Sequence, residues 1–154
     1  MNIRTAQTSD ALQLSSLILQ AVYDIKDSDF DDEGWDRFSK AIEPEEIERR
    51  ISSTDYQIFV AIIGSEIVGT ISILQNEKID QLFIANNYRR RGIASALWHH
   101  AKANADNNGG TGSFWVRSST LGVPLYESFG FKKTGSRQKL KGISFQLLEY
   151  NEAE

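Results

Sequence analysis

The residues best suited to chemistry form a basic turn between two apolar segments. Arg89, Arg90, Arg91 and Gly92 follow a predicted strand and precede a stretch with helical periodicity. The first backbone N–H groups of a helix have no partner within it, and the helix dipole is positive there. Since Gly92 and Ala94 carry little or no side chain, a bulky anion can approach the backbone. The stretch predicts a pyrophosphate-binding turn, with a solvated basic loop as the alternative.

The spacing of this turn differs from both common nucleotide-binding patterns. A P-loop requires a Gly four residues before Gly-Lys, and the dinucleotide pattern requires three glycines; neither is present. Instead, Arg89 to Ala94 has the pattern Arg-x-x-Gly-x-Ala, directly after an apolar strand and before a long amphipathic helix. This arrangement resembles the coenzyme A signature, Gln/Arg-x-x-Gly-x-Gly/Ala, of the GNAT superfamily of N-acetyltransferases.

A second stretch, from Ser118 to Phe131, resembles the later GNAT signature. In that family a polar residue, often Asn, precedes a short helix that carries a Tyr, and Gly-Phe follows. Tyr126 and Gly130-Phe131 match this pattern, whereas Ser119 stands at the Asn position, where its shorter hydroxyl can still hydrogen-bond the pantetheine arm. The resemblance spans residues from about 56 to 136, with a compatible helical N-terminal part.

The resemblance implies a chemical role for Tyr126. Acyl transfer from a thioester expels a thiolate, and a thiol with a pKa of about 8.5 leaves more readily when a phenol donates a proton or a hydrogen bond. Tyr126 is therefore the expected general acid. The alternative is a core aromatic residue, which is the expectation for Phe129 and Phe131.

The acceptor amine needs a base, because an amine with a pKa of about 10 is protonated at neutral pH. In the family this group often lies on the strand before the phosphate turn. Period-two alternation predicts that Asp80 is the only acid on its face of that strand. That face would carry Lys78, Asp80, Leu82 and Ile84. We expect Asp80 to be the base or a substrate contact, with Glu77 less favoured and a solvated edge Asp as the alternative.

The resemblance also implies how coenzyme A is held. In the family, the strand before the turn separates from its neighbour at a bulge, and the pantetheine amides pair with its open edge. Backbone N–H groups near Leu82 would then polarise the thioester carbonyl. The expected coenzyme A contacts are Leu82, Phe83, Ile84, Arg89, Arg90, Arg91, Gly92, Ile93, Ala94, Ser95, Ser119 and Tyr126.

Three aromatic residues of the N-terminal part are candidates for the acceptor site. Tyr23, Trp35 and Phe38 lie in the region that caps the cleft in this family, although core packing explains them equally well. The acids between residues 24 and 33 either attract a cationic amine or are merely solvated. His99 and His100 are adjacent on a predicted helix and point to different faces, so we expect surface histidines and no metal site.

The elements expected around these motifs follow the order β-α-α-α-βββ-α-β-α-ββ. The predicted strands are 2–6, 56–63, 67–74, 78–84, 111–116, 131–138 and 143–150. The predicted helices are 9–25, a short one within 26–40, 44–52, a long one from about 91 to the stop at 107–110, and 121–129. This order predicts an α+β (mixed α/β) fold of GNAT type: a central twisted mixed sheet of about six or seven strands, flanked by helices.

Composition limits the classes of function. The chain has 154 residues, 40% of them hydrophobic and 25% charged, as expected for a single domain spanning 1–154. The net charge of −4 argues against nucleic acid or anionic lipid as partners and leans towards cationic or neutral ones. Cysteine is absent, which excludes disulfides, zinc thiolates and a cysteine acyl-enzyme. No apolar run approaches the roughly 20 residues of a membrane span, so we expect a cytoplasmic protein.

Together these observations predict an N-acyltransferase that moves an acetyl group from acetyl-CoA to a primary amine. Direct attack in a ternary complex is expected, because no cysteine and no Ser-His-acid arrangement is present to form an acyl-enzyme. The acceptor is a small-molecule or peptide amine, and a homodimer is one assembly that the resemblance allows. Two alternatives stay open: a non-catalytic acyl-CoA sensor on the same fold, and a small RNA-binding module that uses the basic turn and the Gly109–Gly112 loop.

Overall fold

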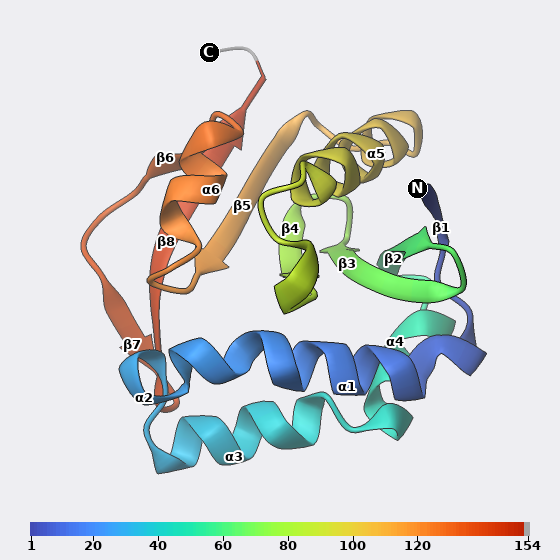
Figure 1. The fold of residues 1–154 in the computed structure, drawn as a ribbon. Helices are drawn as coiled ribbons and strands as arrows, with labels where there is room; N and C mark the ends of the chain where they lie inside the picture. Colours follow the sequence, from blue (N-terminus) through green and yellow to red (C-terminus); the bar gives the residue numbers. More distant parts are fainter. Residues whose placement is uncertain (153–154) are drawn as a thin grey trace.

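One eight-stranded sheet runs through the computed structural model, which describes residues 1–152 (Figure 1). The strand order is β1-β2-β3-β4-β5-β8-β6, and β7 pairs with β8 beside this path. Neighbouring strands are antiparallel except for β4 and β5, which are parallel, so the sheet is mixed. The strands are β1 Asn2–Thr5, β2 Tyr56–Ile63, β3 Glu66–Leu74, β4 Lys78–Ile84, β5 Ser113–Ser118, β6 Lys132–Lys133, β7 Gln138–Leu140 and β8 Ile143–Asn151.

Helices cover both faces of the sheet (Figure 1). They are α1 Ala11–Val22, α2 Lys26–Asp29, α3 Asp32–Ala41, α4 Pro44–Ser52, α5 Ile93–Asn107 and α6 Val123–Ser128, with 3-10 turns at Thr8–Asp10, Tyr23–Ile25 and Asn86–Tyr88. Two apolar clusters separate these layers. One joins the sheet to α5, and the other joins it to α1 and α4.

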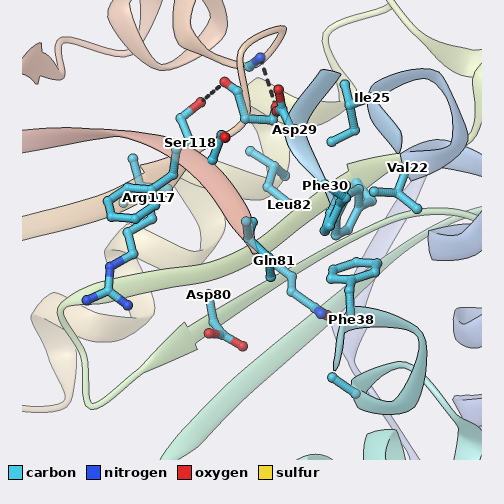
Figure 2. Close-up of a pocket in the computed structure, with 18 of the residues that line it drawn as sticks. Val22, Ile25, Asp29, Phe30, Phe38, Asp80, Gln81, Leu82, Arg117 and Ser118 are labelled. Atoms are coloured by element: carbon cyan, nitrogen blue, oxygen red, sulfur yellow. Dashed lines mark hydrogen bonds between the residues drawn. The ribbon is translucent and has the colours of Figure 1, made fainter. Parts of the chain in front are cut away.

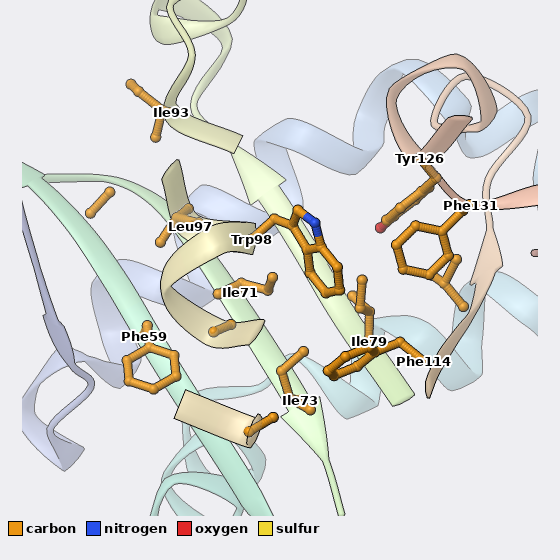
Figure 3. Close-up of a cluster of buried hydrophobic side chains, with 14 of the residues drawn as sticks. Phe59, Ile71, Ile73, Ile79, Ile93, Leu97, Trp98, Phe114, Tyr126 and Phe131 are labelled. Atoms are coloured by element: carbon orange, nitrogen blue, oxygen red, sulfur yellow. The ribbon is translucent and has the colours of Figure 1, made fainter. Parts of the chain in front are cut away.

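The cluster under α5 is built around Trp98, which is almost completely buried (Figure 3). Its indole makes edge-to-face contacts with Phe114 and Phe131, at ring-centroid distances of 5.0 and 5.2 Å. Such pairs add about 0.5–1.5 kcal/mol each beyond the burial of apolar area. The same cluster contains Ile79 of β4 and Tyr126 of α6, so the core packs directly behind the elements that carry the predicted chemistry.

The cluster on the opposite face rests on α1, whose Leu14 and Ile18 are buried one turn apart. Asp10 joins this helix to the first strand. Its carboxylate pairs with the Arg4 guanidinium at 2.8 and 3.0 Å and accepts the Gln7 N–H at 2.7 Å. The beginning of α1 is therefore held against β1 by a partly buried ion pair.

The α+β fold predicted from the sequence is confirmed, with differences in detail. The predicted helix 9–25 is α1 with a 3-10 turn at each end, and the predicted six or seven strands are eight. The strand expected over 131–138 was wrong: β6 and β7 are separate and pair with different parts of β8. The chain turns between them at Gly135, where φ is +71°, so one continuous strand cannot form.

Candidate active site

Strands β4 and β5 separate within the sheet. They pair only at Lys78 with Trp115 and at Ile79 with Val116, whereas β4 stays paired with β3 up to Ile84. Residues 80–84 therefore present the β5-facing edge of their backbone without a strand partner in the described part of the chain. An open edge of this kind offers N–H and C=O groups to an extended ligand.

A β-bulge lies at the point where the two strands part. Ile73 pairs with Ile79 and Ser72 with Gln81, so Asp80 is the extra residue on β4. The prediction that Asp80 and Leu82 share one face by regular alternation was therefore wrong. The bulge shifts the alternation by one residue, and Ile79 and Leu82 both pack towards α5. Asp80, at the bulge itself, lines the cavity together with Gln81 and Leu82 (Figure 2).

A cavity of about 570 Å³ occupies the space between the separated strands and the N-terminal helices. Figure 2 shows side chains from β4 and β5 converging there with Phe30 and Phe38. Tyr126 of α6, Arg50 of α4 and Phe145 of β8 complete different parts of its wall. The cavity thus joins the open edge of β4 to the N-terminal region, which was expected to hold the acceptor.

The basic turn leads directly into α5, which begins at Ile93 rather than at Arg91. Gly92 precedes the helix with a φ of +80°, a conformation that other L-residues adopt only at a cost. A Cβ atom built at Gly92 would meet nothing within 4 Å. The backbone conformation therefore favours glycine, and the space around a Cβ at this position is open, next in sequence to the first free amides of α5, those of Ile93, Ala94 and Ser95.

The three arginines of the turn differ in their surroundings. Arg89 donates to the Asp24 carboxylate at 3.2 Å and to the Ala21 carbonyl at 3.1 Å, so its guanidinium is held against the end of α1. The Arg91 guanidinium lies 5.0 Å from the centre of the Tyr88 ring. Arg90 has a φ of +63°. The turn is thus a folded structure with exposed cations and is tied to α1.

Tyr126 belongs to the core and to the cavity wall at once. Its ring packs edge-on against Phe129 and Phe131, at 6.2 and 5.7 Å between ring centroids, and it is buried. Burial raises the pKa of the Tyr126 phenol, because the phenolate would lose its hydration. The residue therefore keeps its proton at neutral pH, as a hydrogen-bond donor or general acid must.

Ser119 also lines the cavity, and its hydroxyl oxygen accepts the Gly122 N–H at 3.1 Å. This bond fixes the turn that starts α6, so Ser119 orients the helix that carries Tyr126. Because the oxygen is the acceptor, the hydroxyl proton remains available to a ligand. A shorter residue at the usual Asn position thus has a structural function of its own.

Asp80 forms an ion pair with Lys78 at 3.4 Å, and both side chains are about four-fifths buried. The Lys78 ammonium lies 5.2 Å from the centre of the Trp115 ring. Tyr56 faces the same region of the cavity. Burial raises the pKa of the Tyr56 phenol, and the charge of Asp80 raises it further. Asp80 is therefore a positioned carboxylate beside the open edge of β4.

Of the three aromatic candidates for the acceptor site, only Phe38 lines the cavity. Trp35 lies behind it, with ring centroids at 6.4 Å from Phe38 and 5.6 Å from Phe30. Tyr23 is 67% exposed and lies outside the cavity lining. Of the three, Phe38 is therefore part of the cavity wall, and Trp35 packs against it.

Asp29 is a residue of this site that sequence reasoning missed. It was grouped with acids that were expected to be solvated, yet it is 2% exposed. Its carboxylate accepts the Thr120 N–H at 2.9 Å and hydroxyl at 2.7 Å, and it pairs with Arg137 at 2.8 Å. It thereby anchors α2 to the loop that leads into α6. No local pattern reveals this, because the partners lie 91 and 108 residues away.

His99 and His100 are both exposed on α5. Residues 1–152 contain no group of three or more His, Cys, Asp or Glu side chains that could hold a metal ion. In the same part of the chain, no helix combines the length and apolar character needed to cross a membrane.

The fold agrees with that of solved acetyltransferases. A crystal structure of a GCN5-related N-acetyltransferase from Rhodopseudomonas palustris matches with a TM-score of 0.82 at 16% identity, covering 97% of this chain and 94% of that one. The PaiA N-acetyltransferase from Thermoplasma acidophilum, solved in complex with coenzyme A, matches with a TM-score of 0.81 at 18% identity, covering 97% and 98%. At such identities the likeness is one of fold.

Sequence comparison identifies the family. The family model described as Acetyltransferase (GNAT) domain matches residues 26–151, and the chain belongs to this family. Among curated proteins, the uncharacterized N-acetyltransferase YafP of Escherichia coli (strain K12) is 29% identical over 132 residues, which are 86% of this chain and 81% of that protein.

Proposed function

We propose that this protein transfers an acetyl group from acetyl-CoA to a primary amine by direct attack within a ternary complex. The observation that carries the proposal is the continuity of the cavity. The open edge of β4, the Tyr126 phenol and the Asp80 carboxylate all face one space of about 570 Å³, which also extends to the aromatic wall at Phe38. A thioester and an amine bound there would meet between an acid and a base.

The residues present fit coenzyme A. The amides at the start of α5, together with Arg90 and Arg91, would bind the pyrophosphate, and Gly92 provides the required backbone conformation. The open edge of β4 from Leu82 to Ile84 would pair with the amides of the pantetheine arm. Ser119 retains a hydroxyl proton for the same arm. When bound, acetyl-CoA supplies an activated acyl group and a thiolate leaving group.

The proton steps follow from the two sides of the cavity. Asp80, directly or through a water, accepts a proton as the amine nitrogen forms its bond to the acyl carbon. Tyr126 donates a proton or a hydrogen bond to sulfur as the carbon–sulfur bond breaks. Backbone N–H groups near Leu82 stabilise the oxygen of the reacting carbonyl. No covalent acyl-enzyme is required.

Thermal unfolding with and without acetyl-CoA tests the first half of this proposal, with NADH, ATP and a short RNA as comparison ligands. A ligand present at one hundred times its Kd stabilises the folded state by about 2.7 kcal/mol, so the melting temperature must rise. We expect a rise with acetyl-CoA alone. No rise at saturating acetyl-CoA would overturn the coenzyme site, and a rise with RNA would favour a nucleic-acid-binding module.

Release of free thiol from acetyl-CoA in the presence of a panel of amines tests the second half. We expect amine-dependent thiol release above the rate of background hydrolysis. Binding of acetyl-CoA without turnover of any amine in the panel would instead indicate a sensor on the same fold.

A further inference from the structure

We propose that the acceptor amine also carries a carboxylate, and that Arg50 binds this carboxylate inside the cavity. This inference rests on the proposed function and adds the substrate class. It starts from a contrast in charge between the whole chain and its cavity. The chain has a net charge of −4, yet four cationic side chains line the cavity against two carboxylates within the described residues. The cations are Arg37, Arg50, Arg117 and Lys141, and the carboxylates are Asp29 and Asp80.

Both carboxylates are already neutralised. The Asp29 carboxylate pairs with Arg137 at 2.8 Å and also accepts two hydrogen bonds from Thr120. The Asp80 carboxylate pairs with Lys78 at 3.4 Å. Of the four cations, Arg37 has a carboxylate partner, Glu33, at 3.3 Å. The other three have no acidic partner within residues 1–152. The cavity therefore presents unbalanced positive charge to whatever enters it.

Arg50 is the distinctive member of this group because it is 6% exposed. One nitrogen of its guanidinium, Nη2, donates to the Ala41 carbonyl at 2.7 Å. A guanidinium has five N–H donors in a planar fork that matches a carboxylate. A buried cation is stable only when it is paired or well hydrogen-bonded, and a carboxylate ligand would supply the missing partner.

The exposed cations are placed to guide an anion inwards. Arg117 lies over the Trp115 and Phe145 rings, at 5.4 and 5.3 Å from their centres, and Lys141 is exposed in the turn before β8. Both side chains line the same cavity as Arg50. Positive groups at the outer part and at the inner part of one cavity favour a ligand with negative charge.

The other residues of the cavity wall indicate two further features of the acceptor. Phe30, Phe38 and Phe83 form an apolar wall on the N-terminal side, which fits an apolar or aromatic side group. Arg50 and Asp80 both lie near the Tyr56 phenol at this end of the cavity. An amine and a carboxylate on one small molecule could therefore reach Asp80 and Arg50 together. An apolar amino acid has all three features.

Matched substrates test the proposal without any change to the protein. Thiol release is measured with tryptophan against tryptamine, phenylalanine against phenylethylamine, and leucine against isopentylamine. A charge-assisted hydrogen bond contributes about 1.5–3 kcal/mol, so we expect kcat/KM to be roughly 10-fold to 100-fold higher for the amine that retains the carboxylate. Equal or higher kcat/KM for the decarboxylated amines would overturn the inference and leave the proposed acetyl transfer intact. Thiol release with other amines of the panel but with none of these six would overturn the inference and leave the proposed acetyl transfer intact. Thiol release with no amine at all would remove both.

Substitution of Arg50 then assigns the carboxylate contact. Arg50→Gln should raise KM for the amino acids about 10-fold or more and leave the values for the decarboxylated amines unchanged, and Arg50→Lys should give a smaller change. Arg49→Gln is the matched control, since Arg49 is exposed on the same helix and pairs with Glu46 at 2.9 Å. An equal loss with both kinds of amine would show that Arg50 only holds the end of α3, and would overturn its assignment.

Discussion

At the scale of single residues, packing and chemistry are combined in the same side chains. Tyr126 is held by two phenylalanine rings and still faces the cavity, so its phenol is both immobile and kept neutral by burial. Asp80 is likewise held in place, by Lys78. In the proposed mechanism Tyr126 is the acid and Asp80 the base, and immobile side chains suit these roles because they need little reorganisation during the reaction.

Tyr126→Phe should lower kcat about 100-fold while the Kd of acetyl-CoA stays nearly unchanged, because the ring packing is retained and only the proton donor is lost. Thiol-release kinetics and calorimetric titration measure the two quantities. Tyr150→Phe is the control, since Tyr150 contacts the same aromatic cluster at Trp98 but does not line the cavity. Equal losses in turnover and in binding would assign Tyr126 a structural role only.

Asp80→Asn should lower kcat/KM and flatten the part of the pH–rate profile that rises towards alkaline pH, because the amine must then lose its proton without a base. The measurement is kcat/KM across a series of buffers. Glu48→Gln, at an exposed position on α4, should leave the profile unchanged. A profile unaffected by Asp80→Asn would exclude this carboxylate as the base.

At the scale of elements, two irregularities of the backbone create the site. The bulge at Asp80 redirects β4, and the parallel pairing of β4 with β5 ends there after two residue pairs. The turn before α5 is the second irregularity, because Gly92 has a positive φ where the helix begins. A β4 that stayed paired with β5 would close the open edge, and a different backbone conformation at Gly92 would change how the chain enters α5. Both departures from regularity are therefore needed for ligand access.

Gly92→Ala should weaken acetyl-CoA binding, because a Cβ atom disfavours a φ of +80° by about 1 kcal/mol and the turn must move. The control is Gly64→Ala in the turn between β2 and β3, where φ is +64° and a Cβ atom likewise meets nothing within 4 Å. Both variants should lose similar stability in urea, and only Gly92→Ala should lose affinity in titration. Loss of affinity in both, or in neither, would contradict a specific coenzyme function of the turn.

At the scale of the whole molecule, the average charge and the local charge differ in sign. A net charge of −4 led to the expectation of cationic or neutral partners, whereas the cavity is lined by unbalanced cations. Acids elsewhere serve the fold. Asp31 accepts the Gly34 N–H at the start of α3, and Asp10 holds β1 against α1. The free energy of unfolding therefore depends on these two carboxylates, neither of which lines the cavity.

The stability of the protein should therefore fall in acid. The hydrogen bond from Arg4 lowers the pKa of Asp10, and that from Lys139 lowers the pKa of Asp31, both below the ordinary value of 3.8. A lowered folded-state pKa contributes stability that is present above pH 3.8 and is lost as the pH falls through the folded value. Urea unfolding at a series of pH values from about 6 down to about 2 measures this loss of stability.

Asp10→Asn should reduce the acid dependence of the urea midpoint, because the variant has one fewer lowered pKa. Asp27→Asn, at an exposed position on α2, should leave the dependence as it is in the parent protein. An identical acid dependence in the parent and in Asp10→Asn would show that the Arg4–Asp10 pair does not contribute to folding stability.

Local features of the sequence determined much of this protein. The Arg89–Ala94 spacing, the glycine before α5, and the Tyr126 and Gly130-Phe131 motif identified the family, and apolar periodicity placed most helices and strands. These features could be predicted because turns, caps and periodicity depend on residues close together in the chain.

The tertiary structure alone decided which face of β4 carries Asp80, because a bulge depends on pairing with another strand. It also decided that Asp29 is a buried anchor and that Arg50 lies inside the cavity, since their surroundings come from distant segments. The separation of β4 from β5 likewise depends on two strands that are distant in the sequence. Charge and motif are properties of the chain, but burial and the pairing of charges arise only when remote parts of it are packed together.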